Sequence, residues 1–113
     1  EGHRITEVTG LIAHILTGMV KTPTTQVLTT AAGAGAVDIV SAITHIVSTG
    51  VDALSLADGA EGQHKHIVMK TDGGNATLTP THPGNFATIL FDAVGDSAQL
   101  LFTNAAWHFM GGT

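Results

Sequence analysis

Short runs of alternating apolar and polar residues, separated by Asp-Gly and Gly-rich breaks, fill the last two thirds of this 113-residue chain. The runs are rich in β-branched residues, and their length and spacing are typical of β-strands joined by tight turns. We therefore expect one all-β domain, a small antiparallel β-sandwich or barrel-like fold. The runs that carry this prediction lie at 43–48, 51–56, 64–70, 88–92, 98–103 and 106–110.

The breaks between the runs indicate where the chain turns. Residues 58–59 and 72–74 combine Asp with Gly, which tolerates a positive φ, and we expect hairpin-type turns there. The segment 79–85 contains two prolines and should form an exposed loop, whereas the small residues of 29–35 form a linker or a tight-packing segment. Because side chains alternate between the faces of a strand, apolar positions in phase should share the core. These core residues are Leu54, Leu56, Ile67, Met69, Ile89, Phe91, Leu100, Phe102, Trp107 and Phe109.

The first 25 residues differ from the rest, and we expect residues 1–25 to form an N-terminal arm on a β domain of residues 26–113. Apolar residues of the arm follow a spacing of three and four, which is the seam of a coiled-coil helix. They are Ile5, Val8, Ile12, Ile15 and Met19.

Two features oppose a helical arm. Gly10 and Gly18 would each cost about 1 kcal/mol inside a helix. The segment 12–18 also resembles 43–50, which lies in strand-like surroundings. Helix and strand both stay open. In either conformation the apolar stripe needs a partner surface, so we expect its five residues to contact a neighbouring subunit or another protein.

The composition favours an oligomer. Charged residues make up 12% of the chain and aromatic residues 4%. A single domain of this size buries only about two thirds of its unfolded surface, so its core is modest. Association of identical subunits would bury more. Isoleucine at the seam positions of a coiled coil favours three helices over two, so we expect a homotrimer.

Charge and residue content also exclude several partners. The net charge is −5 and the four Lys and Arg residues do not cluster, so we expect no nucleic-acid partner. The chain has no cysteine, which excludes disulfides and thiolate metal sites. No apolar run approaches the roughly twenty residues that span a bilayer, so we expect no membrane partner.

Seven histidines raise the question of a metal site. His64 and His66 are two apart in one expected strand, so both project from the same face and are weak candidates to chelate one ion. Near the axis of a homotrimer such pairs would present six imidazoles. A zinc hydrolase would need a third protein ligand and a supporting shell, which no pattern supplies. The simpler interpretation is that both face solvent, and we predict no metal and no cofactor.

No pattern of catalytic residues stands out. Ser55, His66 and Asp58 can be combined on paper, but the Gly-x-Ser-x-Gly elbow of a serine hydrolase is missing. Asp58, Glu61 and Asp72 do not match a calcium loop. We expect no enzymatic activity and no catalytic residues. His14 and His45 are expected at interfaces or core edges. His108 is expected on the face opposite Trp107 and Phe109, exposed or at a subunit interface, and His82 in a loop without an evident partner.

Three segments, 53–63, 67–81 and 94–104, the last followed by Trp107, carry a family resemblance. They read ALSLADGAEGQ, IVMKTDGGNATLTPT and VGDSAQLLFTN. These segments are similar to β-rich parts of virion structural proteins of tailed bacteriophages and of some large algal viruses. Such parts occur in capsid decoration (cement) proteins, head fibres and fibre-like appendages. The resemblance covers about residues 36–113.

The resemblance implies a viral structural protein on the exterior of the capsid. A decoration protein would bind the major capsid protein and further copies of itself and stabilise the phage head, with the arm as its anchor. The alternative is an adhesin domain of a fibre or tail spike. Such a domain would bind a host receptor or surface glycan through the loops 59–63 and 79–85. The resemblance implies no catalytic residue in either case.

Overall fold

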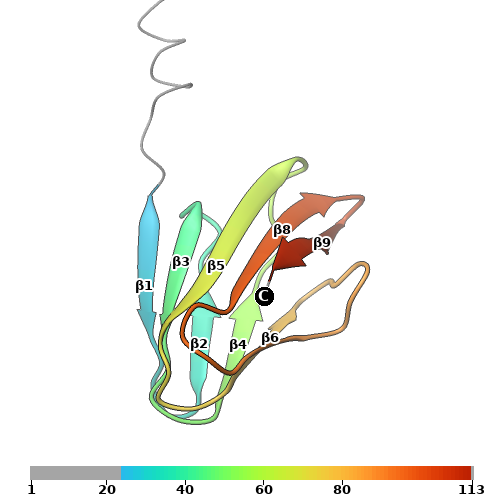
Figure 1. The fold of residues 1–113 in the computed structure, drawn as a ribbon. Coiled ribbons are helices and arrows are strands. Elements are labelled where there is room, and N and C mark those ends of the chain that lie inside the picture. The colour runs from blue at the N-terminus through green and yellow to red at the C-terminus, as the bar shows by residue number, and fades with distance from the viewer. Residues whose placement is uncertain (1–23, 113) are drawn as a thin grey trace, which may run out of the picture.

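The computed structural model describes residues 24–112, which form two packed β-sheets; no helix occurs in this part of the chain. Nine strands make up the sheets (Figure 1). They are β1 (Thr25–Thr29), β2 (Ala34–Val37), β3 (Ile43–Val47), β4 (Asp52–Leu56), β5 (Gln63–Thr71), β6 (Ala76–Pro80), β7 (Ile89–Phe91), β8 (Ser97–Thr103) and β9 (Ala106–Gly112). The predicted all-β class is confirmed for these residues.

The first six strands wind alternately through the two sheets. β1, β3 and β5 pair in parallel in one sheet, and β2, β4 and β6 pair in parallel in the other. Each winding thus lays one strand on each sheet, next to the strand that the previous winding left there. In Figure 1 the two parallel sets lie beside one another, and the turns that join them gather at the lower end.

The last three strands each pair antiparallel with the strand beside which they are added. β7 pairs antiparallel with β6, and β8 pairs antiparallel with β5 and is followed by β9 at the edge. The orders are β1-β3-β5-β8-β9 and β2-β4-β6-β7, so both sheets are mixed. The prediction of an antiparallel domain is therefore wrong for the first six strands. Side-chain alternation is the same in parallel and antiparallel strands, and it cannot indicate the direction of the partner.

The prediction of hairpin-type turns at 58–59 and 72–74 is also wrong, because the sequence pattern does not show which sheet the next strand joins. Residues 58–59 and 72–74 connect strands of different sheets. A two-residue hairpin joins β8 to β9 instead, where Asn104 and Ala105 have φ of 54° and 60°. Two successive positive φ values are those of a type I′ turn. The expected linker 29–35 holds the end of β1, a turn and the start of β2.

The core lies between the sheets and matches the predicted residues. Eight of the ten are buried, and Ile89 and Phe109 are partly buried against them. Trp107 is fully buried; its Nε1 donates to the Ala57 carbonyl oxygen at 2.8 Å, and its ring meets that of Phe102 edge to face, 5.2 Å between centroids. The alternation rule therefore predicted the inward faces correctly although the strand directions differed.

Hydroxyl groups and glycines join the turns at one end of the windings. The Thr30 hydroxyl donates to Asp52 Oδ2 at 2.6 Å and accepts from the Thr49 NH at 2.9 Å. The Ser48 hydroxyl donates to the Gly74 carbonyl at 2.7 Å and accepts from the Gly73 NH at 2.9 Å. Successive turns therefore lie on one another as closely as the strands do.

Gly74 tests how tightly these turns pack. A Cβ at this position would collide with the backbone of Gly50, and its φ lies outside the left-handed region, so the collision alone excludes a side chain. We expect Gly74→Ala to lower the free energy of unfolding by about 1–3 kcal/mol in denaturant titrations. Gly50→Ala is the control because its Cβ would meet no atom within 4 Å. Equal stability of the two variants would contradict the close stacking.

The predicted arm falls almost wholly outside the described residues. Only Thr24 and Thr25 are described, and Thr25 is already the first residue of β1. The five predicted interface residues, Ile5, Val8, Ile12, Ile15 and Met19, lie outside the described part of the chain. The arm, its interface residues and the homotrimer stay predictions.

Candidate functional site

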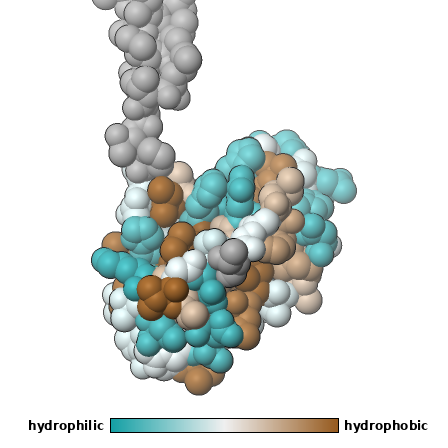
Figure 2. Space-filling model, viewed as in Figure 1, coloured by the Kyte–Doolittle hydropathy of each residue, from teal (hydrophilic) through white to brown (hydrophobic). Residues whose placement is uncertain are grey.

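The loop between β2 and β3, residues 38–42, presents apolar side chains to solvent. Val40 is 83% exposed and Ile39 is 39% exposed. A fully buried valine or isoleucine gains about 1.5–3 kcal/mol over an exposed one, so such positions favour contact with a partner. Figure 2 shows hydrophobic residues reaching the surface among hydrophilic ones on the side of the molecule in view. We call residues 38–42 the β2–β3 loop.

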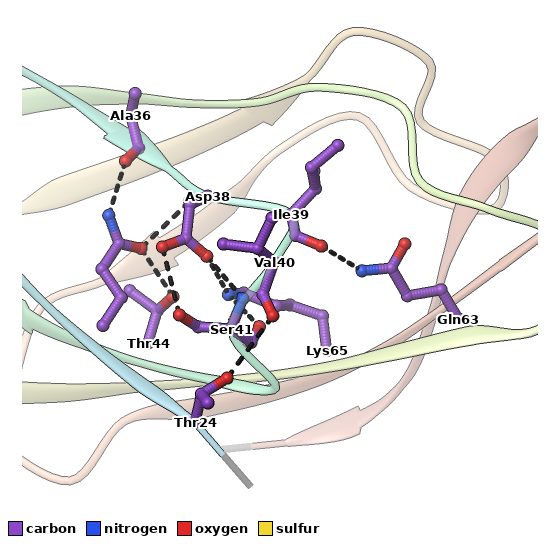
Figure 3. Close-up of polar contacts among 10 residues, drawn as sticks. Thr24, Ala36, Asp38, Ile39, Val40, Ser41, Thr44, Gln63 and Lys65 are labelled. Carbon is purple, nitrogen blue, oxygen red and sulfur yellow. Dashed lines mark hydrogen bonds and ion pairs between the residues drawn. The ribbon is translucent and has the colours of Figure 1, made fainter.

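A buried lysine holds this loop from below. Lys65, on β5, is fully buried, and its Nζ donates to the Ser41 carbonyl oxygen at 2.7 Å. The same Nζ lies 3.4 Å from Asp38 Oδ1. Asp38 in turn accepts from the Ser41 NH at 2.8 Å and from the Ser41 hydroxyl at 3.2 Å. One ammonium group thus fixes both the beginning and the end of the β2–β3 loop (Figure 3).

Two glutamine side chains also form hydrogen bonds with the backbone of the β2–β3 loop. Gln26 Nε2 donates to the Ala36 carbonyl at 3.0 Å, while its Oε1 accepts from the Asp38 NH at 3.0 Å and the Thr44 hydroxyl at 2.8 Å. Gln63 Nε2 donates to the Ile39 carbonyl at 2.6 Å. The backbone on both sides of the exposed residues is therefore held by side chains of β1 and β5 (Figure 3).

The charges of the pair are set by burial and by the loop itself. Burial lowers the pKa of the Lys65 ammonium, and the attraction of Asp38 opposes this shift. Burial alone would raise the pKa of the Asp38 carboxyl, but the Ser41 NH and the Lys65 ammonium hold it below its ordinary value of 3.8. The carboxylate of Asp38 is therefore stabilised by the same contacts that fix the loop.

A shallow groove continues from this loop across the outer face of the five-stranded sheet. It has a volume of about 540 Å³ and is lined by Ala42, Ile43, His45, His64, His66 and Val68. His64 and His66 are exposed and alternate with the buried Lys65 and Ile67, so they share one face as predicted. Among residues 24–112 no group of three or more His, Cys, Asp or Glu side chains is arranged to hold a metal ion.

The residues that could form a hydrolase on paper are not brought together. Ser55 lies on the exposed face of β4 in the four-stranded sheet, whereas His66 lies on the outer face of the other sheet. Asp58 pairs with His82 instead, at 2.8 Å between Oδ1 and Nδ1. The expectation that His82 has no partner is wrong; residue spacing could not reveal a contact across 24 positions.

The three carboxylates rejected as a calcium loop, Asp58, Glu61 and Asp72, do not form a metal-binding group among the described residues. Glu61 accepts from the Asn104 NH at 3.2 Å beside the β8–β9 hairpin. Asp72 belongs to the turn between β5 and β6, where it accepts from the Gly74 NH at 3.1 Å. His108 is partly buried on the face of β9 opposite the buried Trp107, with its Nε2 3.1 Å from the Thr103 carbonyl oxygen.

Two loops that sequence reasoning assigned to receptor binding do lie together. The Asp58–His82 pair joins the β4–β5 loop (57–62) to the β6–β7 loop (81–88). The Trp107 NH donates to the His82 carbonyl at 2.9 Å, and its carbonyl accepts from the Gly84 NH at 2.7 Å. These loops and the start of β9 therefore form one continuous surface.

Comparison with known proteins adds no relative. No protein-family model matches the chain, and a search of curated proteins finds no significant match. Within residues 24–112, no helix has the length and apolar character needed to cross a membrane.

The Asp38–Lys65 pair generates a stability prediction. Asp38→Ala leaves a buried ammonium without its counter-charge, and we expect a loss of about 3 kcal/mol in the free energy of unfolding. The double variant Asp38→Ala/Lys65→Met should recover part of this loss, because no charge then stays buried. Urea titrations of both variants measure the difference. If the double variant is no more stable than Asp38→Ala, the buried charge is not the cause.

The same pair predicts a dependence on pH. The folded state lowers the pKa of Asp38, so its contribution to stability is present above the unfolded value near 3.8 and is lost as the pH falls through the lower folded value. Wild type should therefore lose its advantage over the Asp38→Ala variant in acid.

Proposed function

We propose that this chain is a structural protein of a virus particle, a decoration protein that binds the head of a tailed phage and stabilises it. The proposal starts from the virion-protein resemblance expected from the sequence of residues 36–113. The observation that carries it is the β2–β3 loop, which holds Val40 83% exposed on a backbone fixed by Lys65, Gln26 and Gln63. A preorganised apolar projection binds with a smaller ordering cost than a flexible one.

The protein would attach to the capsid through noncovalent surface contacts alone. Val40 and Ile39 would enter a depression on the major capsid protein, and each contact would gain free energy by burying apolar surface. Many copies on a symmetric shell would add weak contacts into a strong joint attachment. The proposed location is the capsid exterior, and the proposed partners are the major capsid protein and two further copies of this chain. The proposal assigns no enzymatic activity and needs no cofactor.

An adhesin of a fibre or tail spike is the second candidate. The continuous surface of the β4–β5 and β6–β7 loops favours it, since rigid strands commonly present binding loops. The burial of Trp107, the chain's single tryptophan, speaks against a glycan ligand because it leaves that ring unable to stack on a sugar. Electron microscopy of particles separates the two candidates. Density at symmetry positions over the shell supports decoration, and density at the tail supports the adhesin.

Val40 provides the sharpest test of the capsid contact. Val40→Asp should abolish binding to empty capsids and the gain in their heat resistance, because a carboxylate cannot enter an apolar depression without losing its hydration. Val51→Asp is the matched control, since Val51 is 84% exposed but lies in the turn at the other end of the windings. Both variants should melt like wild type. Equal binding of the two variants would contradict the role of the β2–β3 loop.

The arm is tested by deleting residues 1–21. The proposal expects a folded β domain that no longer forms trimers in light scattering and no longer adds to capsids, because the stripe from Ile5 to Met19 is lost. Circular dichroism checks the fold of the truncated chain. Normal attachment without these residues would assign binding to the sheet and loops alone. A monomeric full-length chain at micromolar concentration would count against the homotrimer.

A further inference from the structure

Three histidines on the outer face of the five-stranded sheet differ from the other described histidines. His82 and His108 each have a ring nitrogen within hydrogen-bonding distance of an oxygen. For His45, His64 and His66, no such partner is found in the part of the chain that the structure describes. All three line the groove described above. Their ring nitrogens are therefore available to a ligand from solution.

The spacing of two of them suits chelation. His64 and His66 stand on the same face of β5 with only the inward Lys65 between them. Residues two apart in a strand are successive side chains on one face, so two imidazoles can approach the same ion. His45 lies on β3 one strand away, where its register partner is Val68. The groove is therefore lined by the pair on β5 and by His45 on the neighbouring strand.

The chemistry of the groove selects the kind of ion. Its other lining residues, Ala42, Ile43 and Val68, carry no charged side chain. Imidazole without carboxylate ligands suits zinc, nickel and copper rather than calcium or magnesium, which require oxygen ligands. Lys65 points to the core, where the carboxylate of Asp38 lies 3.4 Å from its ammonium and offsets the charge. The net charge of −5 raises the concentration of cations near the surface.

We propose that His64 and His66 bind a divalent transition-metal ion, such as Zn²⁺ or Ni²⁺, on the outer face of β5. Two imidazoles hold the ion and water fills the remaining positions, since no third His, Cys, Asp or Glu of the described residues completes a group. The site is open and weaker than a structural zinc site with four protein ligands. This inference is independent of the proposed function, because it needs neither a capsid nor a trimer.

Isothermal titration calorimetry of the full chain with ZnCl₂ and NiCl₂ near neutral pH tests the site. We expect binding of either ion, and no heat from CaCl₂. His64→Ala and His66→Ala should each weaken binding by about tenfold or more, since each removes one of two protein ligands. His82→Ala is the control, because its imidazole pairs with Asp58 outside the groove. Melting temperatures check that all variants fold.

Nuclear magnetic resonance adds a direct readout of the ligands. The imidazole signals of His64 and His66 should shift or broaden on addition of Zn²⁺ before those of His82 and His108. Two results would overturn the proposal. One is unchanged affinity in the double variant His64→Ala/His66→Ala, which would assign the ion to other residues. The other is the absence of binding in wild type at millimolar metal.

Discussion

Stacking of each winding on the one before it is the constraint on which the rest of the structure depends. A strand of the first six finds its parallel partner two strands later in the chain, so the backbone hydrogen bonds of one winding are satisfied by the next. The shift from one winding to the next is 18 residues between β1 and β3, where Thr25 pairs with Ile43. It is 23 residues between β3 and β5, where Ile43 pairs with His66. The additional residues of the second winding do not fit within the paired strands and must form loops outside the sheets.

This constraint makes the two ends of the windings unlike. At one end the turns lie against one another, and Gly73 and Gly74 pass so close to the previous turn that a side chain has no room. Thr30, Ser48 and Asp52 use their polar groups to join these turns. At the other end the β2–β3, β4–β5 and β6–β7 loops are longer and can carry exposed side chains. Recognition is therefore expected at the looped end and on the open sheet face beside it.

Sequence reasoning predicted the local structure and missed the connections. Alternation identified the inward residues from Leu54 to Trp107, because burial on one face leaves the same period whatever the partner strand does. It could not show that residues 58–59 and 72–74 lead into the opposite sheet, since an Asp-Gly pair suits a hairpin and a corner equally. β2 was missed because it begins within the small residues of 29–35, which carry almost no apolar period, and β1 offers only Val27 and Leu28 as apolar residues.

The candidate site was predictable only in part. Lys65 is in phase with Ile67 and Met69, so alternation alone would have assigned it to the core, and a charged residue in the core requires a partner. The identity of the partner was not accessible, because Asp38 lies 27 positions away in a loop. The partners of Gln26 were not accessible either, because its side-chain oxygen accepts hydrogen bonds from Asp38 and Thr44, which are distant in the sequence.

The burial of Lys65 indicates what its contacts with Asp38 and Ser41 contribute to the structure. Replacing a buried ion pair by apolar residues of similar size is often neutral or stabilising, so Lys65 is a poor choice if stability alone were at stake. An apolar side chain at this position could not bond to the Ser41 carbonyl or to Asp38, and the β2–β3 loop would lose the group that ties its two ends. The cluster therefore specifies one conformation of the loop. That loop carries Val40 and Ile39 into solvent. The buried charge of Lys65 therefore helps to keep these two exposed apolar side chains in a fixed position.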